Sequence, residues 1–221
     1  MPRWLRRALL AGNGGFDQLR SRRTFGCICP ASASVELTVE RRADRTRAAI
    51  LQAFANLLFR VGFENVSVQG IVAEADIARS TFYEHFSSKE DVLRASMAQF
   101  LTVLAPCVSS HDQPAGLTSM LEHFWENRRL TDAIFSGAAR QVIALSLSEL
   151  IETQLRESAD GELLLPNRLA AIQIAEAQLG LIESWLRGRA FARVDDVAAA
   201  LHRTSQASAA AISRGFAPRK A

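Results

Sequence analysis

Residues 67–86 read SVQGIVAEADIARSTFYEHF, a pattern typical of two short helices joined by a tight turn. From Val68 to Ala75 the apolar residues recur at the spacing i, i+3, i+4 and i+7, which places them on one helix face. Ser67 stands just before them, where its hydroxyl can accept a hydrogen bond from a free backbone N–H and mark the start of the helix. Such helix pairs occur in many all-helical proteins as well as in DNA-binding proteins, so the flanking sequence decides between these classes.

The turn falls at residues 76–78, with the sequence DIA. A bend of this kind needs one residue near the left-handed backbone region, which Asp76 tolerates better than most residues but less well than glycine. The second helix, expected at about 79–85, buries Phe82 and Phe86, four residues apart. Its other face carries hydroxyl, aromatic and imidazole groups, which suit phosphates and base edges.

Composition limits the classes of protein that need to be considered. The chain has 221 residues, of which 48% are hydrophobic, enough for a folded core of one large or two small domains. No apolar run approaches the length needed to span a bilayer, and the start is a poor secretory signal, so we expect a cytoplasmic protein without membrane contact. The three cysteines indicate no disulfide framework, and Cys27 and Cys29 lack companion ligands at zinc spacing. We expect no metal and no cofactor.

The net charge of +3 is unevenly distributed. Residues 1–47 hold ten arginines and four acids, whereas residues 48–91 hold three cations and six acids. Affinity for a DNA backbone would therefore depend on the arginine-rich approach at 41–47. Residues 1–42 show no sustained period and are predicted to be a disordered basic extension. This extension either follows the DNA backbone, or is an inert tail or sequence upstream of a misassigned start codon.

Helices are predicted on both sides of the opening stretch. The apolar stripe from Ile50 to Val61 indicates a strong amphipathic helix, and Gly62 ends it. After Phe86, the sequence SSKED at 87–91 starts another helix, with a serine cap and acids in the first turn.

Residues 46–93 resemble the DNA-binding domain of TetR-type (TetR/AcrR family) bacterial transcriptional regulators. They read TRAAILQAFANLLFRVGFENVSVQGIVAEADIARSTFYEHFSSKEDVL. The resemblance is carried by Thr46-Arg47 before Ile50-Leu51, the run from Phe59 through Gly62 to Phe63, the Ile71 to Ala75 helix, Ser80-Thr81-Phe82-Tyr83, His85-Phe86 and Ser88-Lys89-Glu90. Asp76 departs from the family pattern, which usually has glycine at this turn. The departure implies a slightly strained bend or a re-aimed second helix.

The rest of the chain shows helical periodicity and no strand alternation. We therefore predict an all-α protein with an N-terminal three-helix DNA-binding domain that contains a helix-turn-helix, followed by a larger helical regulatory and dimerisation domain. The predicted boundaries are 1–42 for the extension, 43–92 for the DNA-binding domain, 93–215 for the effector-binding and dimerisation domain, and 216–221 for a tail.

In a helix-turn-helix the second helix lies in the major groove, with its N-terminal residues nearest the bases. Arg79 is the expected base reader, because a guanidinium can bond both acceptors of guanine; a phosphate contact or a solvated side chain is equally open. Lys89 at a helix start is a candidate anion site. The resemblance adds Thr46 with Arg45 or Arg47 as contacts to the flanking backbone. The predicted DNA-binding set is Arg45, Thr46, Arg47, Ser67, Gln69, Arg79, Ser80, Thr81, Tyr83, His85 and Lys89.

The helix expected at 167–187 is apolar on more than one face, so one side should meet a second subunit. With the helix at 195–213, it would form a four-helix bundle across a two-fold axis. Both could instead be ordinary core helices of a monomer. The predicted interface is Ile174, Leu181, Trp185, Val197, Leu201, Ser208 and Ile212.

The resemblance implies a small-molecule pocket in the C-terminal helices. The apolar and aromatic side chains there suit an apolar or aromatic effector, although a plain packed core explains most of them. The candidate lining is Met97, Phe100, Met120, Phe124, Trp125, Phe135 and Trp185.

No catalytic motif or convergent set of acids, bases and nucleophiles is present in the sequence, so we predict that the chain is not an enzyme. The expected function is a homodimeric repressor that binds a palindromic operator and responds to an effector. The alternatives are a regulator without a small-molecule ligand and a helical protein-interaction module.

Overall fold

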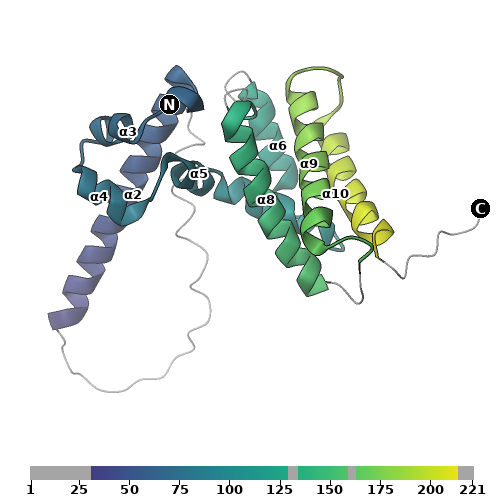
Figure 1. The fold of residues 1–221 in the computed structure, drawn as a ribbon, viewed down its shortest axis with the longest axis horizontal. Helices are drawn as coiled ribbons and strands as arrows, with labels where there is room; N and C mark the ends of the chain where they lie inside the picture. The colour runs from purple at the N-terminus through teal and green to yellow at the C-terminus, as the bar shows by residue number, and fades with distance from the viewer. Residues whose placement is uncertain (1–30, 129–133, 159–162, 214–221) are drawn as a thin grey trace, which may run out of the picture. The chain divides into compact units, whose positions relative to one another are not determined.

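The computed structural model of the chain describes residues 31–128, 134–158 and 163–213 (Figure 1). These residues form helices and no strand; Leu163 and Ser213 share an isolated antiparallel bridge. The predicted all-α class is confirmed. The helices are α2 (Ala31–Val61), α3 (Val68–Ala75), α4 (Arg79–His85), α5 (Lys89–Leu104), α6 (Leu117–Glu126), α8 (Gly137–Ser158), α9 (Asn167–Leu186) and α10 (Val194–Ala211), with short 3-10 turns η1 (Phe63–Asn65) and η2 (Ala105–Val108).

The chain divides into two compact units. Of the described residues, the first unit comprises those up to Val61 together with Asn65–Val92, and the second comprises Gly62–Glu64 and those from Leu93 onward. Helix α5 begins in the first unit and continues into the second.

The core of the first unit forms where α2 packs on α3 and α3 on α4. Helix α2 contributes the buried side chains of Ile50 and Phe54, α3 contributes Ile71, and α4 contributes Phe82. These are the apolar positions of the predicted stripes. The amphipathic pattern therefore placed this core correctly, because each helix has a single well-defined apolar face.

Helix α2 begins at Ala31, ahead of the predicted domain boundary at 43. Residues 31–42 are helical rather than disordered, whereas residues 1–30 of the predicted extension lie outside the described residues. The prediction relied on apolar periodicity, which is weak here. The segment nevertheless contains Ala, Glu and Arg, which favour helices. Extending a helix from a stable segment such as 50–61 also costs little free energy.

The second unit contains a bundle in which α8 and α9 pack along one another and α10 packs on α9 and α6 (Figure 1). Helix α8 buries Ile143, Leu147 and Ile151, while α9 buries Ile174 and Ile182. The turn η2 packs between α8 and α10.

The segment Lys89–Val108 is long and apolar enough to cross a membrane by composition alone, which the sequence reading overlooked. Its side chains Leu93, Leu101 and Leu104 are buried inside the protein. The core helix of a soluble domain has this same composition, so we assign the segment to the core.

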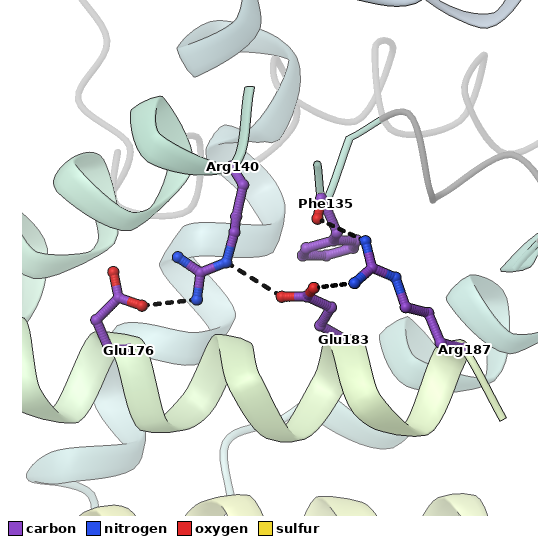
Figure 2. Close-up of polar contacts among 5 residues, drawn as sticks. All are labelled: Phe135, Arg140, Glu176, Glu183 and Arg187. Carbon is purple, nitrogen blue, oxygen red and sulfur yellow. Dashed lines mark hydrogen bonds and ion pairs between the residues drawn. The ribbon is translucent and has the colours of Figure 1, made fainter. Parts of the chain in front are cut away.

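A polar network joins α8 to α9 on the surface of the second unit (Figure 2). Arg140 on α8 pairs with Glu176 at 2.6 Å and with Glu183 at 3.1 Å. Glu183 also pairs with Arg187, whose other nitrogen donates to the carbonyl of Phe135 at 3.3 Å. The pKa of Arg140 is raised, mainly by its hydrogen bond to Glu176. The network fixes the register of α9 against α8.

Candidate DNA-binding surface

Helix α3 starts where the sequence predicted. Ser67 has extended backbone angles, and its hydroxyl accepts a hydrogen bond from the Gly70 N–H at 3.1 Å. This bond satisfies one of the free donors of the first turn and defines the N-terminus of α3. The predicted N-cap is therefore confirmed.

The turn between α3 and α4 is made by Asp76, which adopts left-handed angles of φ 52° and ψ 53°. Among the described residues it is the only one other than glycine with a positive φ. The following N–H, that of Ile77, donates to the Val72 carbonyl at 3.2 Å and closes the end of α3. The predicted left-handed bend is confirmed at Asp76, where a side chain other than glycine carries modest strain.

Substitution of Asp76 should change stability with a sign that depends on the new side chain. Asp76→Gly is expected to raise the free energy of unfolding by roughly 0.5 kcal/mol, because relief of left-handed strain slightly exceeds the added entropy of the unfolded chain. Asp76→Val should lower it by about 1–2 kcal/mol, since a β-branched residue tolerates this region poorly. Urea denaturation followed by far-UV circular dichroism measures both, and the same sign for both variants would contradict this account.

Helix α4 has one buried and one exposed face. Phe82 is completely buried and Phe86 nearly so. Arg79, Ser80 and Tyr83 are exposed. Thr81 and His85 are half-buried. The face predicted to read DNA is thus a continuous polar surface anchored from behind by two phenylalanines, whose ring centroids lie 6.2 Å apart.

The other residues predicted to contact DNA differ in their exposure and in their bonds within the protein. Arg45 and Gln69 are exposed. The guanidinium of Arg47 lies over the Phe86 ring, 4.6 Å from its centroid, which places this cation beside the end of α4. The hydroxyl of Thr46 donates to the carbonyl of Arg42 at 3.1 Å, a bond inside α2.

Lys89 has a structural role that the sequence did not indicate. Its ammonium donates to the Val66 carbonyl at 3.0 Å and thereby holds the segment before α3 against the start of α5. Ser88 caps α5, as predicted, by accepting from the Asp91 N–H at 3.2 Å. The ammonium of the half-buried Lys89 thus bonds a backbone carbonyl, and its predicted role as an anion contact stays a prediction.

One acid of the first unit is neutralised by a neighbour. Glu74 accepts from Arg60 at 3.1 Å and from Asn56 at 3.3 Å, and the hydrogen bond from Arg60 lowers the pKa of this carboxyl. The pair joins α2 to α3. Sequence reasoning missed it because the partners lie far apart in the chain and have no helical spacing.

The described ranges contain no group of three or more His, Cys, Asp or Glu side chains arranged to hold a metal ion. Cys27 and Cys29 lie outside these ranges. Burial raises the pKa of the Cys107 thiol to about 12, so this group is protonated at neutral pH and is a poor nucleophile or ligand.

The residues predicted to line a pocket belong to the second unit and form two aromatic clusters. The ring centroids of Phe100, Phe124 and Phe135 lie 4.9–6.0 Å apart in edge-on contacts. Trp125 stacks on Trp185 at 4.7 Å. Met97 is buried and Met120 half-buried.

The predicted interface residues divide into two groups. Ile174, Trp185, Val197 and Leu201 are buried by their own chain, so the core of one subunit already covers them and they are corrected to core residues. A helix apolar on two sides misled the prediction, because neighbouring helices of the same unit cover both sides of α9 at these positions. Leu181, Ser208 and Ile212 are half-buried and stay predictions.

Comparison with known proteins gives similarities of three kinds: to a family model, to a curated protein and to solved structures. The family model described as bacterial regulatory proteins, tetR family, matches residues 50–96. YxbF, an uncharacterized HTH-type transcriptional regulator of Bacillus subtilis (strain 168), is 32% identical over 71 residues, which cover 32% of this chain and 19% of that protein. The match therefore spans about a fifth of the length of this curated relative.

Among solved structures, a TetR transcriptional regulator from Streptococcus agalactiae 2603V has a TM-score of 0.50 at 22% identity, covering 77% of this chain and 98% of that chain. NalD, the secondary repressor of the MexAB-OprM multidrug efflux pump in Pseudomonas aeruginosa, has a TM-score of 0.47 at 22% identity, covering 80% and 100%. At these identities the first likeness concerns the fold. The resemblance predicted from residues 46–93 is confirmed by the family match.

Proposed function

We propose that this chain is a cytoplasmic homodimeric repressor of transcription, because its residues 50–96 match the model of the tetR family of bacterial regulatory proteins. It binds a palindromic operator, and a small molecule changes its affinity for that operator. A regulator of this family acts by binding and is not an enzyme.

The observation that carries the proposal is the build of α4. Its Phe82 is fully buried, while Arg79, Ser80 and Tyr83 are exposed. A helix mounted in this way can enter the major groove, where its first residues meet base edges and its hydroxyls meet phosphates. The left-handed turn at Asp76 sets the angle at which α4 leaves α3.

The test is binding of the full chain to labelled DNA from upstream of its own gene, in the presence of excess unrelated DNA. We expect a complex that unlabelled DNA of the same sequence displaces. Arg79→Glu should weaken it about 100-fold by placing an acid at the groove. Arg189→Glu, an exposed change in the second unit with the same charge step, should leave it unchanged. Absence of a displaceable complex would favour a helical protein-interaction module.

The dimer proposal is supported by the outer face of α9 and α10. On α9 this face carries small or apolar side chains that one subunit leaves open: Leu169, Ala177, Gly180, Leu181 and Ser184. On α10 it carries Ala199, Ala200, Ala207 and Ala210. Small residues let helices approach closely, so two copies of this face can pack as a four-helix bundle. This moves the proposed interface away from the buried positions named above.

Gly180→Arg is expected to convert the dimer to a monomer. A Cβ atom at Gly180 meets no atom within 4 Å in one subunit, so the folded chain accommodates the side chain, whereas a packed dimer face would bury an unpaired charge. Light scattering after size-exclusion chromatography measures the change, with Gln99→Arg as the matched control. A Gly180→Arg variant that stays dimeric would place the interface elsewhere.

The effector proposal is supported by the aromatic composition of the second unit. The Phe100, Phe124 and Phe135 rings and the Trp125–Trp185 stack offer flat apolar surfaces for an aromatic compound. Because these rings contact one another, a bound effector must reorder them, and this reordering is what would favour one protein conformation over another. Titration with indole and phenol, followed by tryptophan fluorescence and DNA release, tests this. A regulator without a ligand would show neither response.

A further inference from the structure

Arg79 is electrostatically isolated on the surface formed by α3 and α4. It is the only lysine or arginine between residues 61 and 88, a stretch that also contains Glu64, Glu74, Asp76 and Glu84. Arg60 of the first unit is paired with Glu74 at 3.1 Å, whereas no ion pair involves Arg79 within the described part of the chain. Within this stretch the attraction for guanine therefore depends on one guanidinium, whereas Arg47, beside the end of α4, adds attraction for phosphate.

That guanidinium has a specific neighbour. Arg79 Nη2 donates a hydrogen bond to the Tyr83 hydroxyl at 3.3 Å, one helical turn further along α4. The guanidinium carbon lies 5.6 Å from the centroid of the Tyr83 ring, at the outer limit of a cation–π contact. The hydrogen bond is thus the main contact, and the ring adds to it.

Tyr83 is itself held in place. Its ring meets the Phe82 ring edge to face, with centroids 5.4 Å apart and planes at 88°. Phe82 is fully buried, so the position of the tyrosine hydroxyl is tied to the core of the first unit through one aromatic contact. Tyr83 as a whole residue is 48% exposed, which leaves the pair accessible to DNA.

We infer that Tyr83 is a positioning residue, which holds Arg79 extended along α4 so that Arg79 reads a guanine in each half-site. The inference rests on the proposed function. A guanidinium has five N–H donors, so one bond to Tyr83 leaves both donors of Nη1 and one of Nη2 for the O6 and N7 acceptors of guanine. Restricting a long side chain to its bound conformation before binding raises affinity, because less conformational freedom is lost in the complex.

The experiment begins with selection of binding sites from a random DNA library by the full-length protein. Affinities are then measured for the selected site and for sites with each base replaced. Arg79→Ala should lower affinity for the selected site about 10- to 100-fold and remove the preference for one guanine per half-site. Tyr83→Phe, which keeps the ring and loses the hydrogen-bond acceptor, should lower affinity about 2- to 5-fold.

The decisive readout is the double variant. In the Arg79→Ala background, Tyr83→Phe should have no further effect, because its role acts through Arg79. Gln69→Ala, an exposed change on α3 without contact to Arg79, provides the comparison: its effect should be the same in both backgrounds. Circular dichroism confirms that each variant is folded.

Three results would overturn the inference while leaving the proposed function intact. Tyr83→Phe could bind as tightly as the unmodified protein, or it could lose the same factor in both backgrounds, which would mean that Tyr83 contacts DNA directly. An Arg79→Ala variant that keeps the guanine preference would also overturn it. If the unmodified protein selects no DNA at all, the proposed function itself fails, and the two failures are thereby distinguished.

Discussion

Replacement of Phe82 with alanine is expected to unfold the first unit and abolish DNA binding. The side chain is completely buried and contacts the rings of Tyr83 and Phe86, with centroids 5.4 and 6.2 Å away. Removing a buried phenylalanine costs about 3–5 kcal/mol, a large share of the stability of a small domain. Urea denaturation followed by far-UV circular dichroism should show a helical transition at much lower urea.

Tryptophan fluorescence separates the two units in this experiment once Trp4 is replaced by phenylalanine, because the other two tryptophans, Trp125 and Trp185, both belong to the second unit. Phe191→Ala is the matched control: the same atoms are removed from a side chain that is 86% exposed, so the change should stay within about 0.5 kcal/mol. If Phe82→Ala denatured at the same urea concentration as the unmodified protein, the proposed anchor of α4 would be wrong.

Gln178→Glu is expected to destabilise the second unit by about 3–5 kcal/mol at neutral pH, because it buries an uncompensated charge. Gln178 lies on α9 and is 2% exposed. Its amide nitrogen donates to the Ser205 hydroxyl at 2.8 Å and to the Leu104 carbonyl at 3.4 Å, while its oxygen has no partner. A carboxylate would lose both donated bonds and face these oxygens.

The loss of folding stability in Gln178→Glu should depend on pH. Burial raises the pKa of the introduced carboxyl in the folded state above its unfolded value of about 4.3. The variant is therefore close to the unmodified protein below that pH, where the acid is protonated and resembles the amide, and it loses stability as the pH rises through the raised value. Thermal denaturation from pH 4 to pH 8 measures this.

Gln141→Glu is the control for this substitution, since Gln141 lies on α8 in the same unit, is exposed and stands outside the proposed dimer face. We expect it to change stability by less than about 0.5 kcal/mol at every pH. If Gln178→Glu lost the same stability at pH 4 and at pH 8, the lost amide hydrogen bonds, rather than the buried charge, would account for most of the loss.

The elements around α3 and α4 were predictable because their signals are local. Ser67 caps α3 through an atom three residues away, and Asp76 makes the turn through its own backbone angles. Gly62, with φ +76°, follows the end of α2 in the same way. Each of these features depends on a few adjacent residues, so the sequence contains all the information needed to find them.

The second unit was harder to predict because its helices are apolar on several faces. On α8, the apolar side chain of Leu145 is 48% exposed, while those of Ile143 and Leu147 are buried. The seven candidate interface residues failed in part for the same reason. Where two faces of a helix are equally apolar, periodicity cannot decide which one packs against a neighbour.

From the sequence alone one could determine that the chain is all-α, where the helix-turn-helix begins and bends, and which phenylalanines anchor its second helix. Only the tertiary structure showed that Lys89 donates to the Val66 carbonyl, that Arg79 donates to the Tyr83 hydroxyl, and that Gln178 is buried. The physical reason is the range of the interactions. Caps and turns are closed by neighbours along the chain, whereas burial and ion pairing depend on which distant residues share a volume once the helices have packed.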